Sequence, residues 1–249
     1  MSDRCTRNLH TDEVTVSLPN NQDLFDQQRE KFRKEARRLW KLHNPHIVRV
    51  QDLFDENGTT YYTMDYIEGA SLADYLRQHA NPLGEDEVRG ILNQLLDALD
   101  AIHQAGFCHL DLKPRNVMRD NQGNIYLIDF GASKQVVDAN GHTIATSSLL
   151  LGTPGYAPME QMTGNYRNCG PWTDIYALGA TLYNLLTKRP LPNVDEIAEN
   201  PSEALPMPAT ISQQMQNLIL WMMKPQRTKR PQNIAEIRKY IGQSMARQK

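Results

Sequence analysis

A regular apolar pattern between residues 88 and 102 constrains the fold more than any other feature of this sequence. Apolar residues recur there at positions i, i+3, i+4 and i+7, which makes one broad face of a helix apolar. This face consists of Val88, Ile91, Leu92, Leu95, Leu96, Leu99 and Ile102. Gly106 follows the pattern, in the position where glycine commonly ends a helix. The pattern predicts a long helix within a larger, mainly helical part of the chain that begins after residue 68.

The first 68 residues have a mixed α and β character. Residues 14–18 alternate apolar and polar side chains, which favours a short strand. Residues 22–43 contain no proline or glycine and place apolar residues at helical spacing, so we predict a helix there. Residues 46–54 and 59–67 are typical of strands, and Asn57-Gly58 between them indicates a hairpin turn.

Shorter signals follow the long helix. We expect two short strands at residues 116–120 and 124–129, joined by a turn. Residues 173–188 indicate a buried helix that ends before the proline-rich segment 190–208. Because that segment contains five prolines, we expect it to be mostly irregular. The last helices are predicted at 213–223 and 233–243.

Composition and charge limit the classes of protein that fit this chain. Its 249 residues are 40% hydrophobic and 22% charged, as in a soluble globular protein. The net charge of −2 implies no general attraction to nucleic acid or to anionic lipid. The three cysteines form no CxxC pair, and there is no long apolar run or apolar leader at the N-terminus. We therefore expect a cytoplasmic protein with free thiols that binds neither nucleic acid nor membrane.

Four polar residues lie close together in sequence on a predicted loop and at a strand end. "HLDLKPRN", residues 109–116, contains Asp111, Lys113 and Asn116, and "LIDFG" contains Asp129. Two carboxylates and an amide oxygen are hard ligands that suit Mg²⁺, and a lysine is a natural partner for phosphate. A single Asp or Asn of this kind more often only makes a turn. All four in this order favour phosphoryl transfer instead.

These residues also resemble motifs of the protein kinase family. "HLDLKPRN" resembles the catalytic loop H-R-D-x-x-x-x-N, and "DFG" at 129–131 matches the metal-binding motif. "GTPGYAPMEQ", "DIYALG" and "KRP" follow in the family's order, and "GTPGYAP" and "LIDFGASK" are most similar to bacterial serine/threonine kinases. The resemblance implies an α+β, protein-kinase-like two-lobe fold with a truncated small N-lobe, residues 1–68, and a mainly helical C-lobe, residues 69–249.

The resemblance implies roles for individual residues. Asp111 would orient the substrate hydroxyl, Lys113 would neutralise the γ-phosphate of ATP, and Asn116 and Asp129 would hold Mg²⁺. Met64 would be the gatekeeper residue, and Asp65, Ile67 and Met118 would contact adenine. The remaining family positions would be structural, and they are Glu35, Thr153, Glu160, Asp174 and Arg230.

The chain departs from the family pattern before its first long helix. The family carries a glycine-rich loop and a V-A-I-K lysine there, but residues 1–34 contain no glycine, and Lys31 and Lys34 lie in the predicted helix itself. Glu35 would therefore lack its lysine partner. A charge pair about 4 Å apart at an effective dielectric of about 20 is worth roughly 4 kcal/mol. Its loss corresponds to about a thousandfold in rate if the pair acts fully in the transition state.

A second departure is Leu110, where many family members have an arginine that binds a phosphorylated activation loop. Leucine has no charge and no donor, so we expect that phosphate on this loop does not act through residue 110. The loop still contains hydroxyl groups, and those considered are Thr143, Thr146, Ser147 and Ser148.

Three functions are consistent with these observations. The first is a serine/threonine protein kinase that uses ATP and Mg²⁺ on a protein substrate, with activity in doubt because the lysine is missing. The second is a pseudokinase that acts as a binding or scaffold module, which the missing lysine favours. The third is a small-molecule phosphotransferase, against which "GTPGYAPME" and Lys113-Pro114 argue. We favour a kinase by type, and the sequence does not indicate an oligomeric state.

Overall fold

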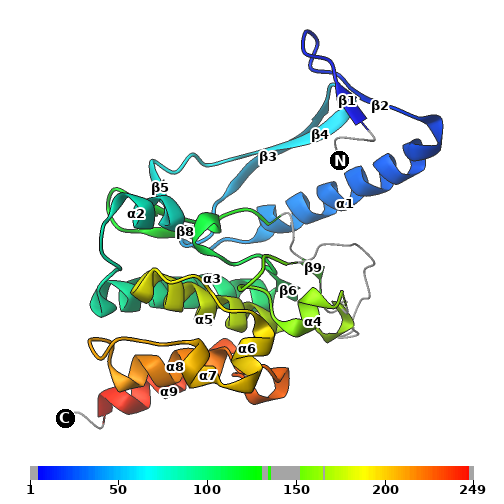
Figure 1. Cartoon of the computed structure of the whole chain (residues 1–249). Coiled ribbons are helices and arrows are strands. Elements are labelled where there is room, and N and C mark those ends of the chain that lie inside the picture. Colours follow the sequence, from blue (N-terminus) through cyan, green and yellow to red (C-terminus); the bar gives the residue numbers. More distant parts are fainter. Residues whose placement is uncertain (1–4, 131–133, 136–151, 165, 247–249) are drawn as a thin grey trace. The chain divides into compact units, whose positions relative to one another are not determined.

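The computed structural model describes residues 5–130, 134–135, 152–164 and 166–246 (Figure 1). The chain divides into two compact units. Unit 1 contains residues 1–43 and 47–66, and unit 2 contains residues 44–46 and 67–249. The predicted division into domains at residues 68 and 69 stays a prediction.

Unit 1 consists of two β-hairpins and a long helix. Its elements are β1 (Cys5–Arg7), β2 (Val14–Val16), η1 (Pro19–Asn21), α1 (Gln22–Lys41), β3 (Val50–Glu56) and β4 (Thr59–Met64). β1 pairs with β2 and β3 with β4, both antiparallel. Asn57 and Gly58 connect β3 to β4 with φ values of 49° and 72°. Positive φ at both turn residues is what an Asn-Gly hairpin turn requires, so the sequence prediction of this hairpin is confirmed.

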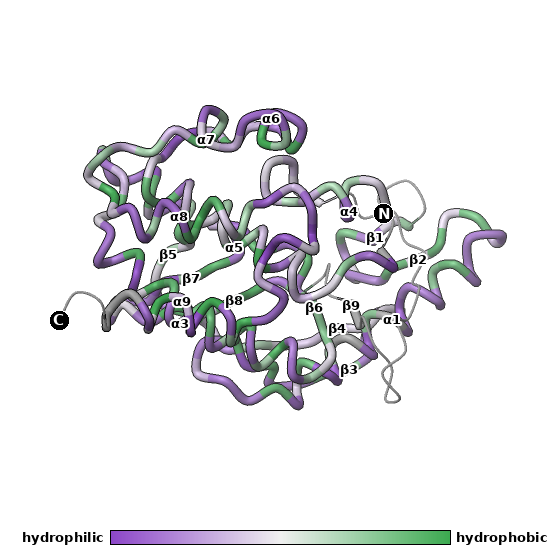
Figure 2. The backbone as a smooth tube through the Cα atoms, turned by 90° about the horizontal axis from the view of Figure 1, so that it is seen from below, coloured by the Kyte–Doolittle hydropathy of each residue, from purple (hydrophilic) through white to green (hydrophobic). Residues whose placement is uncertain are grey.

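The two hairpins and α1 of unit 1 are joined by specific contacts. The Val14 amide donates to the Asn57 carbonyl at 2.9 Å, so that β2 lies against the turn of the second hairpin. A Cβ atom on Gly58 would lie 2.8 Å from the Val14 oxygen, which explains the glycine there. Hydrophobic and hydrophilic residues alternate along α1 (Figure 2), and Phe32 on this helix stacks on Tyr62 of β4 at 5.2 Å.

The first half of unit 2 combines helices with a small antiparallel sheet. Its elements are β5 (Gly69–Ser71), α2 (Leu72–Gln78), α3 (Glu85–Gln104), β6 (Phe107–Cys108), η2 (Pro114–Asn116), β7 (Val117–Asp120), β8 (Ile125–Leu127) and β9 (Lys134–Gln135). The strands form a sheet of order β5-β7-β8 and a separate β6–β9 pair. The predicted helix over 88–102 and the strands predicted at 116–120 and 124–129 are all found.

The second half of unit 2 is helical. Its elements are α4 (Met159–Met162), η3 (Tyr166–Asn168), α5 (Pro171–Thr187), α6 (Val194–Glu199), α7 (Pro201–Ala204), α8 (Gln213–Met222), η4 (Arg227–Lys229) and α9 (Ile234–Ala246). The prediction that residues 190–208 are mostly irregular is wrong, because α6 and α7 lie there. Asn193 and Glu196 form a capping box that starts α6, and Pro201 occupies the first turn of α7, where proline is tolerated.

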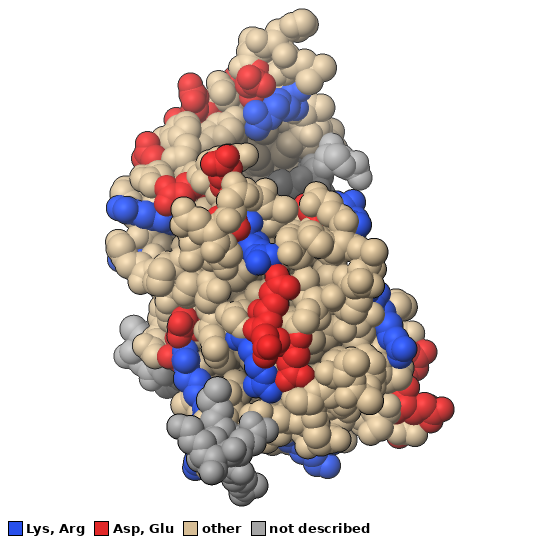
Figure 3. Space-filling view, turned by 90° about the vertical axis from the view of Figure 1, so that its left-hand side faces the viewer, with Lys and Arg blue, Asp and Glu red and all other residues tan. Residues whose placement is uncertain are grey.

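The core of unit 2 lies between α3 and α5, which contact each other (Figure 1). All seven apolar residues of the predicted α3 face are buried, and α5 is buried along most of its length. Outside the core, acidic and basic side chains are interspersed on the face shown in Figure 3. Among the described residues, no helix combines the length and the hydropathy needed to cross a membrane.

Candidate active site

The Asp111 carboxylate is the centre of a hydrogen-bonded cluster in unit 2. Lys113 Nζ donates to both of its oxygens, at 2.9 and 2.8 Å. Thr153 Oγ1 donates to Oδ1 at 2.9 Å, and Asn116 Nδ2 donates to Oδ2 at 2.9 Å. Three residues predicted to act together, Asp111, Lys113 and Asn116, are thus brought together, and Thr153 joins them from 40 residues away.

Thr153 and Lys113 also bind each other within this cluster. The Lys113 ammonium donates to Thr153 Oγ1 at 2.8 Å, so the hydroxyl accepts from the lysine and donates to the carboxylate. The side chains of Asp111 and Lys113 are each 20% exposed. The carboxylate is therefore held by three donors and yet is accessible to a molecule from solution.

Asp129 lies at the same end of the β7–β8 pair as Asn116. Val117 pairs with Leu127, and the Ile128 amide donates to the Asn116 carbonyl at 2.9 Å. Asp129 is exposed and has φ of 60°, a left-handed conformation that aspartate tolerates better than most residues. The next residue, Phe130, is buried. The two predicted metal ligands therefore come from neighbouring positions on adjacent strand ends.

Asn116 has the chemistry expected of a cation ligand. Its side chain is buried, and its Nδ2 group donates to the carbonyl and the carboxylate of Asp111, at 2.8 and 2.9 Å. These bonds orient the amide and leave its oxygen as the atom that can coordinate a cation. An amide oxygen and a carboxylate suit Mg²⁺, which takes few protein ligands together with phosphate oxygens. The residues present therefore fit this metal.

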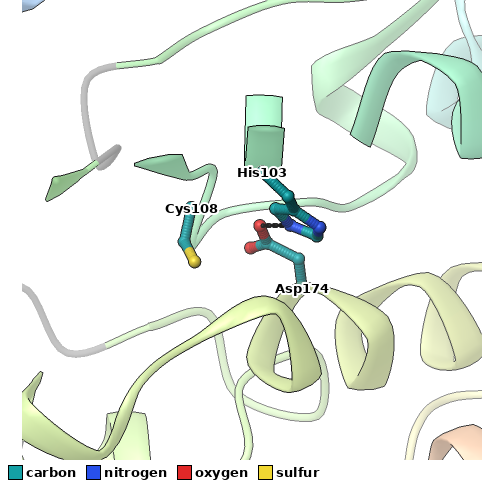
Figure 4. A group of neighbouring side chains, drawn as sticks. All are labelled: His103, Cys108 and Asp174. Atoms are coloured by element: carbon teal, nitrogen blue, oxygen red, sulfur yellow. Dashed lines mark hydrogen bonds and ion pairs between the residues drawn. The ribbon is translucent and has the colours of Figure 1, made fainter. Parts of the chain in front are cut away.

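Asp174 on α5 holds the start of the 109–116 loop. Its buried carboxylate accepts from the backbone amides of His109 and Leu110, each at 2.8 Å, and from His103 Nε2 at 2.8 Å. Figure 4 shows His103 and Asp174 joined, with Cys108 beside them. Burial acts to raise the pKa of Asp174, but the hydrogen bonds from His103 and the loop outweigh it and lower the pKa. The structural role predicted for Asp174 agrees with these contacts and stays a proposal.

Leu110 has a strained backbone that its neighbours stabilise. Its φ of 62° is uncommon for a leucine, because Cβ then approaches the backbone carbonyl. Its amide donates to Asp174 Oδ1 at 2.8 Å, and its carbonyl accepts from Gln161 Nε2 at 2.6 Å. The Leu110 side chain is buried, so this position is apolar and carries no exposed charge. The four hydroxyl residues considered for phosphorylation lie outside the described residues.

Glu160 and Arg230 form a buried ion pair. Arg230 donates to the two carboxylate oxygens at 2.7 and 3.3 Å, and the side-chain exposures are 0% for Arg230 and 7% for Glu160. Arg230 also donates to the carbonyls of Lys224, Pro225 and Trp172. This pair links the short helix α4 to the segment before α9. The structural role predicted for the two residues agrees with these contacts and stays a proposal.

The residues predicted to contact adenine are divided between the units. Asp65 belongs to unit 1, where its amide donates to the Arg49 carbonyl at 3.0 Å, whereas Ile67 and Met118 belong to unit 2. Met118 lies in β7 and pairs with Ser71 and Tyr126. Their joint role stays a prediction. Glu35 lies in α1, but its side chain is outside the described part of the chain.

Sequence reasoning missed several residues that support the site. His103 contacts Asp174, His109 Nε2 donates to the Ile128 carbonyl at 3.2 Å, and Gln161 binds Leu110. Burial lowers the pKa of His109, which favours its neutral form. His109 could have been found, because it occupies the histidine position of the H-R-D motif. His103 and Gln161 gave no signal beyond their nearness to recognised motifs.

Comparison with known proteins agrees with this geometry. The protein kinase domain model matches residues 3–240. The serine/threonine-protein kinase PrkC of Bacillus subtilis is 36% identical over 159 residues, which are 64% of this chain and 24% of that protein. Serine/threonine-protein kinase F of Synechocystis is 38% identical over 180 residues, which are 67% of this chain and 35% of that protein. This chain thus spans about a quarter to a third of these curated relatives.

A solved structure described as the PpkA-294 apo form is also similar. It matches with a TM-score of 0.78 and 26% identity, and the match covers 96% of this chain and 83% of that one. A small unit with strands and one long helix, together with a larger helical unit, defines a protein-kinase-like fold. The chain belongs to the protein kinase domain family, and it is similar to bacterial serine/threonine kinases.

Proposed function

We propose that this chain transfers the γ-phosphate of ATP to a serine or threonine hydroxyl of a protein substrate. The observation that carries the proposal is the cluster around Asp111, in which Lys113, Asn116 and Thr153 all bind one accessible carboxylate. An isolated Asp in a turn needs no such set of donors. A carboxylate held in place beside a lysine suits a reaction that depends on positioning and on charge stabilisation.

Asp111 would accept a hydrogen bond from the substrate hydroxyl and orient it for attack. Three donors already fix the rotamer of this carboxylate, so that little ordering remains when substrate binds. The Lys113 ammonium would move part of its hydrogen bonding to the transferred phosphoryl group, where negative charge is spread over the oxygens. Thr153 would hold Asp111 and Lys113 at their observed separation.

Asn116 and Asp129 would hold Mg²⁺ through the amide oxygen and a carboxylate oxygen. When bound, Mg²⁺ neutralises negative charge on the phosphates of ATP. Asp174 would act at a distance from the chemistry, because it holds the amides of His109 and Leu110 and so places Asp111.

A pseudokinase is the second candidate, and one observation favours it. Residues 1–34 contain no glycine and no V-A-I-K motif, so this segment has no glycine-rich phosphate-covering loop and no V-A-I-K lysine to pair with Glu35. Such a chain would bind nucleotide or a protein through the same site with little transfer.

The two candidates are distinguished by measuring nucleotide binding and phosphate transfer on the same samples. Calorimetry with ATP, with and without Mg²⁺, is expected to show weak binding that requires Mg²⁺ and is reduced in Asp129→Asn. Mass spectrometry after incubation with Mg²⁺, ATP and a protein substrate is expected to find phosphoserine or phosphothreonine. Binding without any transfer would support the pseudokinase, and binding of ATP that is independent of Mg²⁺ would contradict the metal assignment.

A further inference from the structure

A cleft of unit 2 lies directly beside the Asp111 cluster. Its volume is 650 Å³, and its lining includes Lys113 and Thr153, which both bind the Asp111 carboxylate. Apolar surface comes from Leu76 of α2 and from Tyr156. A polypeptide whose hydroxyl reaches Asp111 would place neighbouring side chains in this cleft. The cleft is therefore suited to recognise residues near the phosphorylated one.

Among the residues that the structure describes, four cationic residues and no acidic residue line this cleft. The cations are Arg77, Lys113, Arg115 and Lys188. Two of them have a carboxylate partner outside or at the edge of the lining, since Arg77 pairs with Asp74 and Lys113 pairs with Asp111. The remaining pair, Arg115 and Lys188, leaves the cleft with excess positive charge.

Arg115 is the more exposed source of this charge. It is in η2, two residues after Lys113, and it is exposed. Among the residues that the structure describes, no hydrogen bond or ion pair joins its guanidinium to an acid. Arg115 and Arg77 line the same cleft, and the hydrogen bonds from Ser71 and Arg77 lower the pKa of Asp74, with the charge of Arg115 acting in the same direction.

Lys188 has a structural role that leaves its charge in place. It ends α5 with φ of 52°, and its ammonium donates to the carbonyls of His79 and Ala80 at 2.6 and 3.4 Å. A simple helix cap would explain these contacts. However, carbonyl acceptors do not neutralise an ammonium group, and lysine has three N–H donors, of which these bonds use two.

We propose that this cleft selects protein segments that carry anionic side chains beside the hydroxyl to be phosphorylated, with Arg115 as the main specificity-determining residue and Lys188 as the second. The anion is a carboxylate or a phosphate, which share the chemistry that guanidinium and ammonium groups recognise. This inference rests on the proposed function, because it assigns the cleft to the substrate of that reaction. Two exposed ion pairs are expected to give about a tenfold preference in affinity.

The test measures binding, so that it does not depend on phosphate transfer. Fluorescein-labelled peptides carry alanine in place of the acceptor serine, flanked on both sides by Glu, by Gln, by Lys or by phosphoserine. Anisotropy is measured with the whole chain at low and at physiological salt. The Glu and phosphoserine peptides are expected to bind about tenfold tighter than the Gln peptide, the Lys peptide more weakly than the Gln peptide, and the preference should fall as salt rises. Comparing Glu with phosphoserine separates the two sources of anion.

Variants identify the residues responsible. Arg115→Gln is expected to reduce the preference to about threefold, and the double variant Arg115→Gln/Lys188→Gln is expected to remove it. Glutamine at position 188 can still donate to the His79 carbonyl, so the fold should be kept. Lys229→Gln removes an equal charge from an exposed position on η4 outside the cleft and should leave the preference unchanged. Circular dichroism confirms that each variant is folded.

Two results of the binding measurements would overturn the inference. One is equal binding of the Glu and Gln peptides, and the other is a preference that persists in the folded double variant. Failure of the proposed function gives a different result, namely selective binding of acidic peptides together with no phosphate transfer to the matching serine peptides. Transfer to neutral and acidic serine peptides at equal rates would leave the function intact and overturn the specificity.

Discussion

Replacing Arg230 with methionine tests how the buried Glu160–Arg230 pair stabilises unit 2. Methionine keeps much of the volume but removes every donor. The Glu160 carboxylate would lose both of its bonds from Arg230, and among the described residues it would keep only the bond from Thr173 Oγ1 at 3.1 Å. The carbonyls of Lys224, Pro225 and Trp172 would each lose a donor.

The expected loss follows from this list of broken contacts. Removal of one partner from a buried ion pair costs about 3–5 kcal/mol, because the other charge stays buried without compensation. Domains are stable by about 5–15 kcal/mol, so Arg230→Met should remove a large fraction of the stability of unit 2. Glu160→Gln/Arg230→Met removes both charges, and it should cost less than the sum of the two single changes.

Tryptophan fluorescence during urea unfolding provides the assay. Trp172 and Trp221 lie in unit 2 and Trp40 in unit 1, so a Trp40→Phe background restricts the signal to unit 2. Lys229→Met, at an exposed position on the neighbouring η4, is the matched control and should change the free energy of unfolding by less than about 0.5 kcal/mol. A loss below about 1 kcal/mol for Arg230→Met, or strict additivity in the double variant, would refute the reasoning.

Three other predictions concern the site and the two units. Thr153→Val should lower the rate of phosphate transfer by roughly 10–100-fold with little change in ATP affinity, because the Asp111 carboxylate loses one hydrogen-bond donor. Thr153→Ser keeps the hydroxyl and should keep most of the rate, so an equal loss in both variants would argue against a role for the hydroxyl. Gly69→Ala should destabilise unit 2 by about 1–3 kcal/mol, because the new Cβ would lie 2.0 Å from the Arg119 oxygen. Gly90→Ala on α3 places a Cβ with nothing within 4 Å and should stabilise unit 2 by about 0.4–1 kcal/mol. Urea unfolding measures both variants, and equal effects would contradict the close approach at Gly69. In unit 1, the hydrogen bonds from Arg33 and then Thr60 lower the pKa of Asp55 to about 2. The contribution of Asp55 to stability should therefore be complete above its unfolded pKa, about 3.9, and be lost as the pH falls through about 2; an NMR titration of the Asp55 carboxyl with a midpoint near 3.9 would exclude these bonds.

The sequence predicted the elements whose patterns are local. The α3 face could be read from spacing alone, because burial of one helix face requires that periodicity, and the second hairpin of unit 1 could be read from Asn57-Gly58. The α6–α7 segment was mispredicted because proline count was taken as evidence against helix, although Pro201 at a helix start is favourable.

The candidate site was predictable in its residues but not in its contacts. Asp111, Lys113 and Asn116 lie within six positions, so motif spacing was enough to group them. Thr153 was assigned only through the resemblance, and nothing local in sequence indicates that its hydroxyl lies 2.9 Å from Asp111. The bonds from Gln161 and to Asp174 depend on how distant helices pack, which a pattern in one segment does not determine.

In the proposed function, the Asp111 carboxylate directs phosphate transfer to a hydroxyl. Single-turnover transfer from ATP to a serine-containing protein substrate, measured for the wild type and for Asp111→Asn, tests it most directly. Asparagine preserves the size of the side chain but cannot accept the hydroxyl proton. We expect a rate at least about a hundredfold lower in the variant, in the range of general-base effects, with ATP affinity nearly unchanged. Equal rates in the two proteins, or no transfer by a wild type that binds Mg²⁺ and ATP, would contradict it.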